Sequence, residues 1–202
     1  NYYRPTDNLQ LVANFYYGKD TRNSDLIRFH HDNSIVARYY KNRASKGISQ
    51  CAFSINSHLG FQTNDSIKSS DQYMMGTAIA NRIWFNKNKL ALTLRGDYVT
   101  NPGLYLAFSP SPVTPNDFLD AIANDTEQKL EIFQATATFD IMPNDFVTFR
   151  LEYAYRQSNV PYFAGAGGTT SPDGWQGSST IGWRPDLSKT ENRLTAAVNF
   201  RL

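Results

Sequence analysis

The sequence predicts an all-β fold of long antiparallel strands, and two patterns carry this prediction. In "TFRLEYAYR", residues 148–156, every second side chain is large and apolar or aromatic, and charged or small side chains stand between them. Alternation at period two indicates a β-strand with two unlike faces. The second pattern lies in the connections, because the later ones alternate between very short and very long. Together the patterns indicate hairpins in a single sheet.

Eight strands follow from the alternation, with almost no helix. They cover roughly residues 8–18, 25–41, 48–62, 72–86, 89–101, 128–142, 146–157 and 191–202. The stretch "HHDNS", residues 30–34, is compatible with a bulge or a turn inside the second strand. The segment "PNDFLDAIAND", residues 115–125, predicts one short helix within a loop.

The connections predict two different ends of the sheet. "FNKNKL" and "IMPNDF" are tight turns, with Asn, Asp and Pro at positions that turn geometry favours. The long connections, about 102–127 and 158–190, hold most of the proline and glycine and are expected to be extracellular loops. Short turns at one end and long loops at the other are typical of an outer-membrane barrel. We therefore expect an antiparallel transmembrane β-barrel of the outer membrane of a Gram-negative bacterium.

Composition limits the alternatives. The 202 residues fit one domain, either a whole barrel or its C-terminal half, and a formal net charge of +2 predicts no nucleic-acid partner. A transmembrane helix is excluded because no run of about 18 apolar residues occurs, whereas a transmembrane strand needs only about 10 alternating residues. Cys51, the single cysteine, excludes an internal disulfide. The opening "NYYRPTDN" has no apolar signal region, so we expect a processed chain or a piece of a longer one.

The alternation also assigns faces. Turning an arginine toward lipid costs roughly 2–4 kcal/mol near the bilayer midplane, so the charged set is expected to face the lumen. The lumen-facing candidates are Arg38, Arg82, Arg95, Asp97, Arg150, Glu152, Arg156, Arg193 and Arg201. The lipid-facing candidates are Leu92, Leu94, Phe133, Phe139, Phe149, Leu151, Tyr153, Leu194, Val198 and Phe200. Alternation alone also allows a soluble barrel or sandwich, but the polar face is rich in Thr, Ala, Gln and Asn rather than Lys and Glu.

Three segments carry a family resemblance: "ANRIWFNKNKLALTLRGDYVTNPGLYL" (80–106), "DFVTFRLEYAYRQSNVPYFAG" (145–165) and "ENRLTAAVNFRL" (191–202). They resemble the OmpL-like β-barrel porin family of Bacteroidota over most of residues 72–202, whereas the first 70 residues share only the general character of the family's sequences and none of its specific motifs. The resemblance implies an outer-membrane location, a pore role and a longer parent chain of which these segments form the C-terminal half. We therefore expect about eight strands of a barrel of about 16.

The residues predict a non-enzymatic role without cofactor or metal. Adjacent strand residues point to opposite faces, so His30 and His31 do not form a metal site. "AGAGG", residues 164–168, lacks the lysine and the helix of a phosphate loop. A porin-like channel for small hydrophilic solutes or ions is the leading interpretation, and the excess of inward arginines predicts mild anion selectivity. The charges could instead pair across strands, with Glu152 on Arg150, Arg156 or Arg193.

The alternative is a structural or interaction barrel, a subunit of an envelope complex with no open pore. Eight strands would leave an interior filled by side chains, whereas about 16 would leave a channel. Membrane lipids and lipopolysaccharide are expected partners in either case, and a homo-oligomer is compatible with both.

Overall fold

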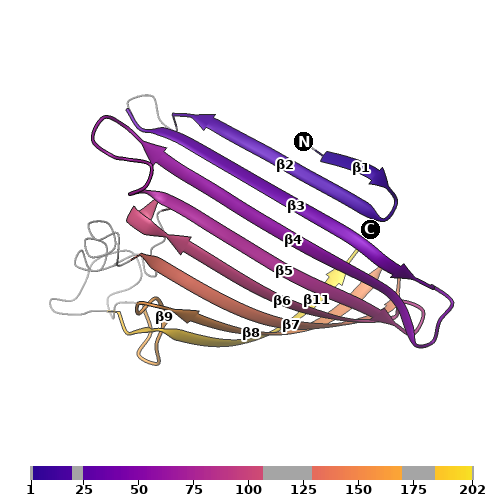
Figure 1. The fold of residues 1–202 in the computed structure, drawn as a ribbon. Coiled ribbons are helices and arrows are strands. Elements are labelled where there is room, and N and C mark those ends of the chain that lie inside the picture. Colours follow the sequence, from indigo (N-terminus) through magenta and orange to yellow (C-terminus); the bar gives the residue numbers. More distant parts are fainter. Residues whose placement is uncertain (1, 20–24, 107–128, 170–184, 202) are drawn as a thin grey trace.

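The computed structural model describes residues 2–19, 25–106, 129–169 and 185–201, and it is all-β. One antiparallel sheet of nine strands runs in the order β1-β2-β3-β4-β5-β6-β7-β8-β11 (Figure 1). The strands are β1 Tyr2–Thr6, β2 Leu9–Gly18, β3 Ile27–Lys41, β4 Ile48–Thr63, β5 Tyr73–Phe85, β6 Leu90–Asn101, β7 Leu130–Asn144, β8 Val147–Ser158 and β11 Thr190–Phe200. A separate pair, β9 Phe163–Ala164 and β10 Leu187–Ser188, lies between β8 and β11 in the chain.

The prediction of an all-β antiparallel fold is confirmed. All eight predicted strands are present, with bounds shifted by a few residues at most. The short strands β1, β9 and β10 were not predicted, and the helix expected at 115–125 lies outside the described residues. Apart from the short 3-10 turn η1, Pro102–Leu104, the described part of the chain contains no helix. No helix among these residues has the length and apolar character needed to cross a membrane.

Strand β3 corrects one detail of the prediction. Residues 30–34 form neither a bulge nor a turn, because they pair continuously with β2 and β4. Their side chains find partners across the strands: Asn14 donates to Asp32 at 3.1 Å, and His31 stacks on Phe15 with ring centroids 4.2 Å apart. The irregularity falls instead between Arg38 and Tyr40, where the register with β4 shifts.

The two ends of the sheet differ as the sequence predicts, and the difference extends to every hairpin. One end carries the short connections 7–8, 42–47, 86–89 and 145–146, and the other carries 19–26, 64–72, 102–129 and 159–189 (Figure 1). In the turn at 86–89, Asn86, Lys87 and Asn88 have φ of 50°, 58° and 67°. The hydroxyl of Ser49 donates to Asn88 Oδ1 at 2.7 Å and fixes this left-handed stretch.

The sheet is strongly curved, and its edges are open. In Figure 1 it curls away from the viewer, so that β11 lies behind the front strands. Strands β1 and β11 form the two edges, and they do not pair with each other. The described strands therefore form a curved wall and not a closed barrel.

Candidate lumen surface

The strand register brings the predicted charged residues onto one face of the sheet. Directly paired residues share a face, and one such row runs from Arg38 through Ala52, Arg82, Thr93, Thr138 and Glu152 to Thr195. Parallel rows, offset by two residues, join Arg95 to Arg193, Asp97 to Arg156, and Asp140 to Arg150. We call this the charged face. Arg201 follows the end of β11, so the register does not place it.

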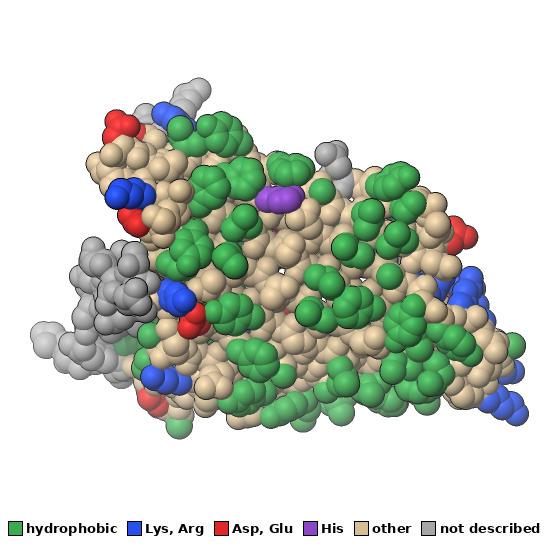
Figure 2. Space-filling model, in the orientation of Figure 1, with side chains coloured by type: hydrophobic (Ala, Val, Ile, Leu, Met, Phe, Trp, Pro, Cys, Tyr) green, Lys and Arg blue, Asp and Glu red, His purple; other side chains and the backbone are tan. Residues whose placement is uncertain are grey.

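The predicted lipid-facing residues all lie on the opposite face. Leu92 pairs with Phe139 and Phe139 with Leu151, while Leu94 leads through Ala137 and Tyr153 to Leu194. Nine of the ten are exposed, up to 70% for Leu194 and 74% for Phe200, and only Leu92 is intermediate. Figure 2 shows hydrophobic side chains spread over this face, with the charged ones gathered near the strand ends. Such a continuous exposed apolar surface is typical of contact with a membrane or another protein.

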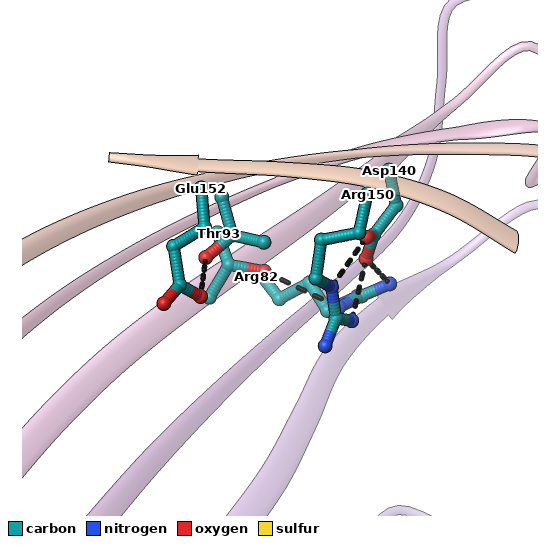
Figure 3. Close-up of polar contacts among 6 residues, drawn as sticks. Arg82, Thr93, Asp140, Arg150 and Glu152 are labelled. Carbon is teal, nitrogen blue, oxygen red and sulfur yellow. Dashed lines mark hydrogen bonds and ion pairs between the residues drawn. The ribbon is translucent and has the colours of Figure 1, made fainter. Parts of the chain in front are cut away.

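The most buried charge on the charged face is Asp140, which the predicted set of lumen-facing charges leaves out. Its side chain is fully buried, and it binds two arginines (Figure 3). Arg150 donates from Nε to Oδ1 at 2.7 Å and from Nη2 to Oδ2 at 3.0 Å, while Arg82 Nη2 lies 2.6 Å from Oδ2. The alternation along β7 places Asp140 in phase with Thr136 and Thr138, so the same pattern could have identified it.

The other charged side chains on this face have partners that the sequence did not predict. Glu152 accepts a hydrogen bond from Thr138 at 2.8 Å, rather than pairing with Arg150. Arg156 forms an ion pair with Glu191 at 3.1 Å, and Arg95 forms one with Asp97 at 2.8 Å. The guanidinium of Arg38 donates to the Asn8 side chain at 2.7 and 2.9 Å.

Arginines outnumber carboxylates on the described part of the charged face. The strand register places there the arginines Arg28, Arg38, Arg82, Arg95, Arg150, Arg156 and Arg193, and the carboxylates Asp32, Asp97, Asp140, Glu152 and Glu191. Among the described residues, Arg193 has no carboxylate within ion-pairing distance. The fixed charge along this face is therefore net positive.

The histidines divide between the two faces. His30 lies on the charged face with His58, their ring centroids 6.0 Å apart, whereas His31 lies on the apolar face against Phe15. Within the described ranges, no group of three or more His, Cys, Asp or Glu side chains is arranged to hold a metal ion. In the connection after β8, burial raises the pKa of the Tyr162 phenol, and the nearby Arg156 charge opposes this rise.

Long antiparallel strands with one apolar and one charged face, joined by alternating short and long connections, define the wall of a transmembrane β-barrel. A family model described as "Putative beta-barrel porin-2, OmpL-like" matches residues 1–202. The chain belongs to this β-barrel porin family, which implies an outer-membrane location and favours a non-enzymatic role. The match includes the first 70 residues, so the extent read from the sequence motifs was too short. No curated protein and no solved structure matches the chain.

Proposed function

We propose that the protein is a channel in the outer membrane of a Gram-negative bacterium, through which small hydrophilic solutes or ions diffuse passively. The observation that carries the proposal is the charged face, where ionised side chains stand opposite a continuous exposed apolar surface. Burying that many arginines against lipid would cost several kcal/mol, whereas a water-filled lumen hydrates them. The apolar face then meets the hydrocarbon.

The open edges support a barrel with more strands than these. Each unpaired backbone N–H or C=O costs several kcal/mol in hydrocarbon, so the outer edges of β1 and β11, which no other described strand covers, require partners inside a membrane. Further strands, to about 16, would supply these partners and leave an aqueous channel, whereas about eight strands close into a filled interior. The proposed channel thus consists of this wall together with additional strands.

The net positive charge of the charged face favours anions in such a channel. Rings or patches of fixed charge in a pore tune ion preference, and here several arginines are neutralised by Asp97, Asp140 and Glu191. Arg193 and the other excess arginines leave a positive remainder. The expected preference is therefore mild.

A structural or interaction barrel within an envelope complex is the second candidate. The observation that favours it is the Asp140 cluster, because a buried carboxylate paired with two arginines also suits a closed barrel interior that side chains fill. The apolar face would meet lipid and lipopolysaccharide in both cases.

Reconstitution of the full-length protein into planar bilayers separates the two. The channel predicts discrete conductance steps that grow with salt concentration, and a reversal potential in a KCl gradient that favours chloride. Protein whose heat-modifiable gel migration shows a folded barrel, but which produces no steps, would overturn the channel in favour of the structural barrel. A clear cation preference would overturn the predicted selectivity.

A further inference from the structure

The connection after β6 begins by folding back across the charged face. Its first residues, 102–106, include the turn η1 and then Tyr105, whose side chain is only 2% exposed. Tyr105 contacts residues of β3 and β4 that lie more than 40 positions away in the chain. The segment 102–106 therefore packs on the face that the proposed channel would expose to water, and we call it the latch.

Several contacts hold Tyr105 in place. Its hydroxyl donates to the carbonyl of Phe29 at 3.1 Å and lies 3.1 Å from Nδ1 of His30. The guanidinium of Arg28 stands over the Tyr105 ring at 4.7 Å and donates to its carbonyl at 3.3 Å. His30 also stacks on the ring, with an interplanar angle of 8°. The ring is thus fixed by hydrogen bonds, a cation–π contact and stacking together.

The backbone around the latch is shaped to admit it. A Cβ at Gly60 would lie 2.5 Å from the Tyr105 ring, so glycine is needed beneath it. Gly103 has φ +62°, and a Cβ there would collide with the Asp71 carbonyl. Buried Asn101 closes the segment, donating to the Leu106 carbonyl at 2.7 Å and accepting from its N–H at 3.0 Å.

We propose that Tyr105 is a positioning residue that pins the latch over β3, β4 and β5 and narrows the permeation path near the long-connection end. The inference rests on the proposed channel, because narrowing matters only where solutes pass. The latch adds an aromatic ring beside Arg28, His30 and His58, so the narrowed section has cationic and imidazole groups on its wall. Solutes are expected to be selected there by size, and anions to be favoured over cations of equal size.

The experiment uses the full-length protein and two variants, one on each side of the contact between the Tyr105 ring and Gly60. Tyr105→Ala removes the ring, and Gly60→Val displaces it by placing a branched side chain in its space. Gly96→Val is the matched control, because a Cβ at Gly96 meets nothing within 4 Å and Gly96 lies on the apolar face. Tyr105→Ala combined with Gly60→Val tests the coupling, since the valine has no ring to displace once Tyr105 is gone.

Two measurements keep the latch and the channel distinguishable. The first is the rate at which a membrane-impermeant maleimide labels a cysteine placed at Leu106, in a Cys51→Ser background. We expect Tyr105→Ala and Gly60→Val each to raise this rate on the order of tenfold, equivalent to about 1.4 kcal/mol, with no further rise in the double variant. The second is step conductance in planar bilayers, which should increase in the same variants and stay unchanged in Gly96→Val.

Each outcome decides the proposal. Labelling rates that stay at the parent value in both variants would overturn the latch, even if conductance persists. Raised labelling with unchanged conductance steps would overturn the narrowing. Raised labelling with no conductance in any variant, the parent included, would support the pinned latch and refute the channel.

Discussion

Asp140 provides the sharpest test of the charged face, because it is fully buried and holds two arginines. Asp140→Asn keeps the size of the side chain and removes its charge, so Arg82 and Arg150 lose their shared counter-ion. Breaking a buried pair costs about 3–5 kcal/mol, but the two arginine side chains keep 26% and 37% exposure, so water screens part of the loss. We expect the free energy of unfolding to fall by about 2–3 kcal/mol, in line with the loss of hydrogen bonds to a charged group.

Asp97→Asn is the matched control for this prediction. It removes the same charge from the same face, but Asp97 is 25% exposed and its ion-pair partner among the described residues is Arg95 alone, which is 46% exposed. Its loss should cost no more than about 1 kcal/mol, as for exposed pairs. Urea-induced unfolding in lipid vesicles, followed by heat-modifiable gel migration, measures both variants. Equal losses for Asp140→Asn and Asp97→Asn would refute the idea that burial and double pairing set the energy of this cluster.

Substitutions on the two faces and in one turn test the face assignment, the turn conformation and the ion preference. Leu151→Arg should lower the free energy of unfolding by about 2–4 kcal/mol because it places a charge in lipid. Thr195→Arg, on the charged face, should change the free energy of unfolding by less than about 1 kcal/mol. A larger loss for Thr195→Arg than for Leu151→Arg in urea unfolding would contradict the face assignment. Lys87→Gly should stabilise by about 1 kcal/mol because Lys87 adopts φ of 58°, and a loss in the same assay would refute this. Arg193→Gln should weaken the anion preference measured as the reversal potential in a KCl gradient, because Arg193 has no carboxylate partner among the described residues. An unchanged reversal potential would exclude Arg193 from the lumen.

The sequence predicts the faces of this sheet well because one physical period decides them. A residue two positions along a strand returns to the same face, so Phe149, Leu151 and Tyr153 separate from Arg150 and Glu152 without any knowledge of neighbouring strands. Strand β3 shows the limit of local reasoning. Residues 30–34 look like a break, and only partners on adjacent strands, such as Phe15 against His31, make them part of a continuous strand.

The contacts within the candidate site depend on register, which the sequence alone does not give. Arg82 reaches Asp140 across β6, where the fully buried Ala91 lies between the two strands and leaves room for the guanidinium. No local sequence pattern predicts the register of β5, β6 and β7 that brings these two side chains together. The same holds for Tyr105, whose partner His30 lies 75 positions away in the chain.

The short strand β1 was missed because it gives a weak signal. It contains Pro5, and a proline cannot donate to a strand ladder, so it is expected only at an edge or in irregular backbone. The structure places β1 at the edge of the sheet, and its register with β2 shifts between Tyr3 and Thr6. Pro5 is therefore compatible with an edge strand, but a proline in the sequence argues against predicting one there.

A sheet that separates lipid from water presents two distinct sets of positions along β8, and a cysteine scan of this strand distinguishes them. Single cysteines at residues 149–156, in a Cys51→Ser background of the full-length protein in lipid vesicles, are labelled with a water-soluble and a lipid-partitioning thiol reagent. We expect reaction with the lipid-partitioning reagent at positions 149, 151 and 153, and with the water-soluble reagent at positions 150, 152 and 156. Equal reaction of both sets with the water-soluble reagent, or alternation in the opposite phase, would show that the sheet does not separate lipid from water in this way.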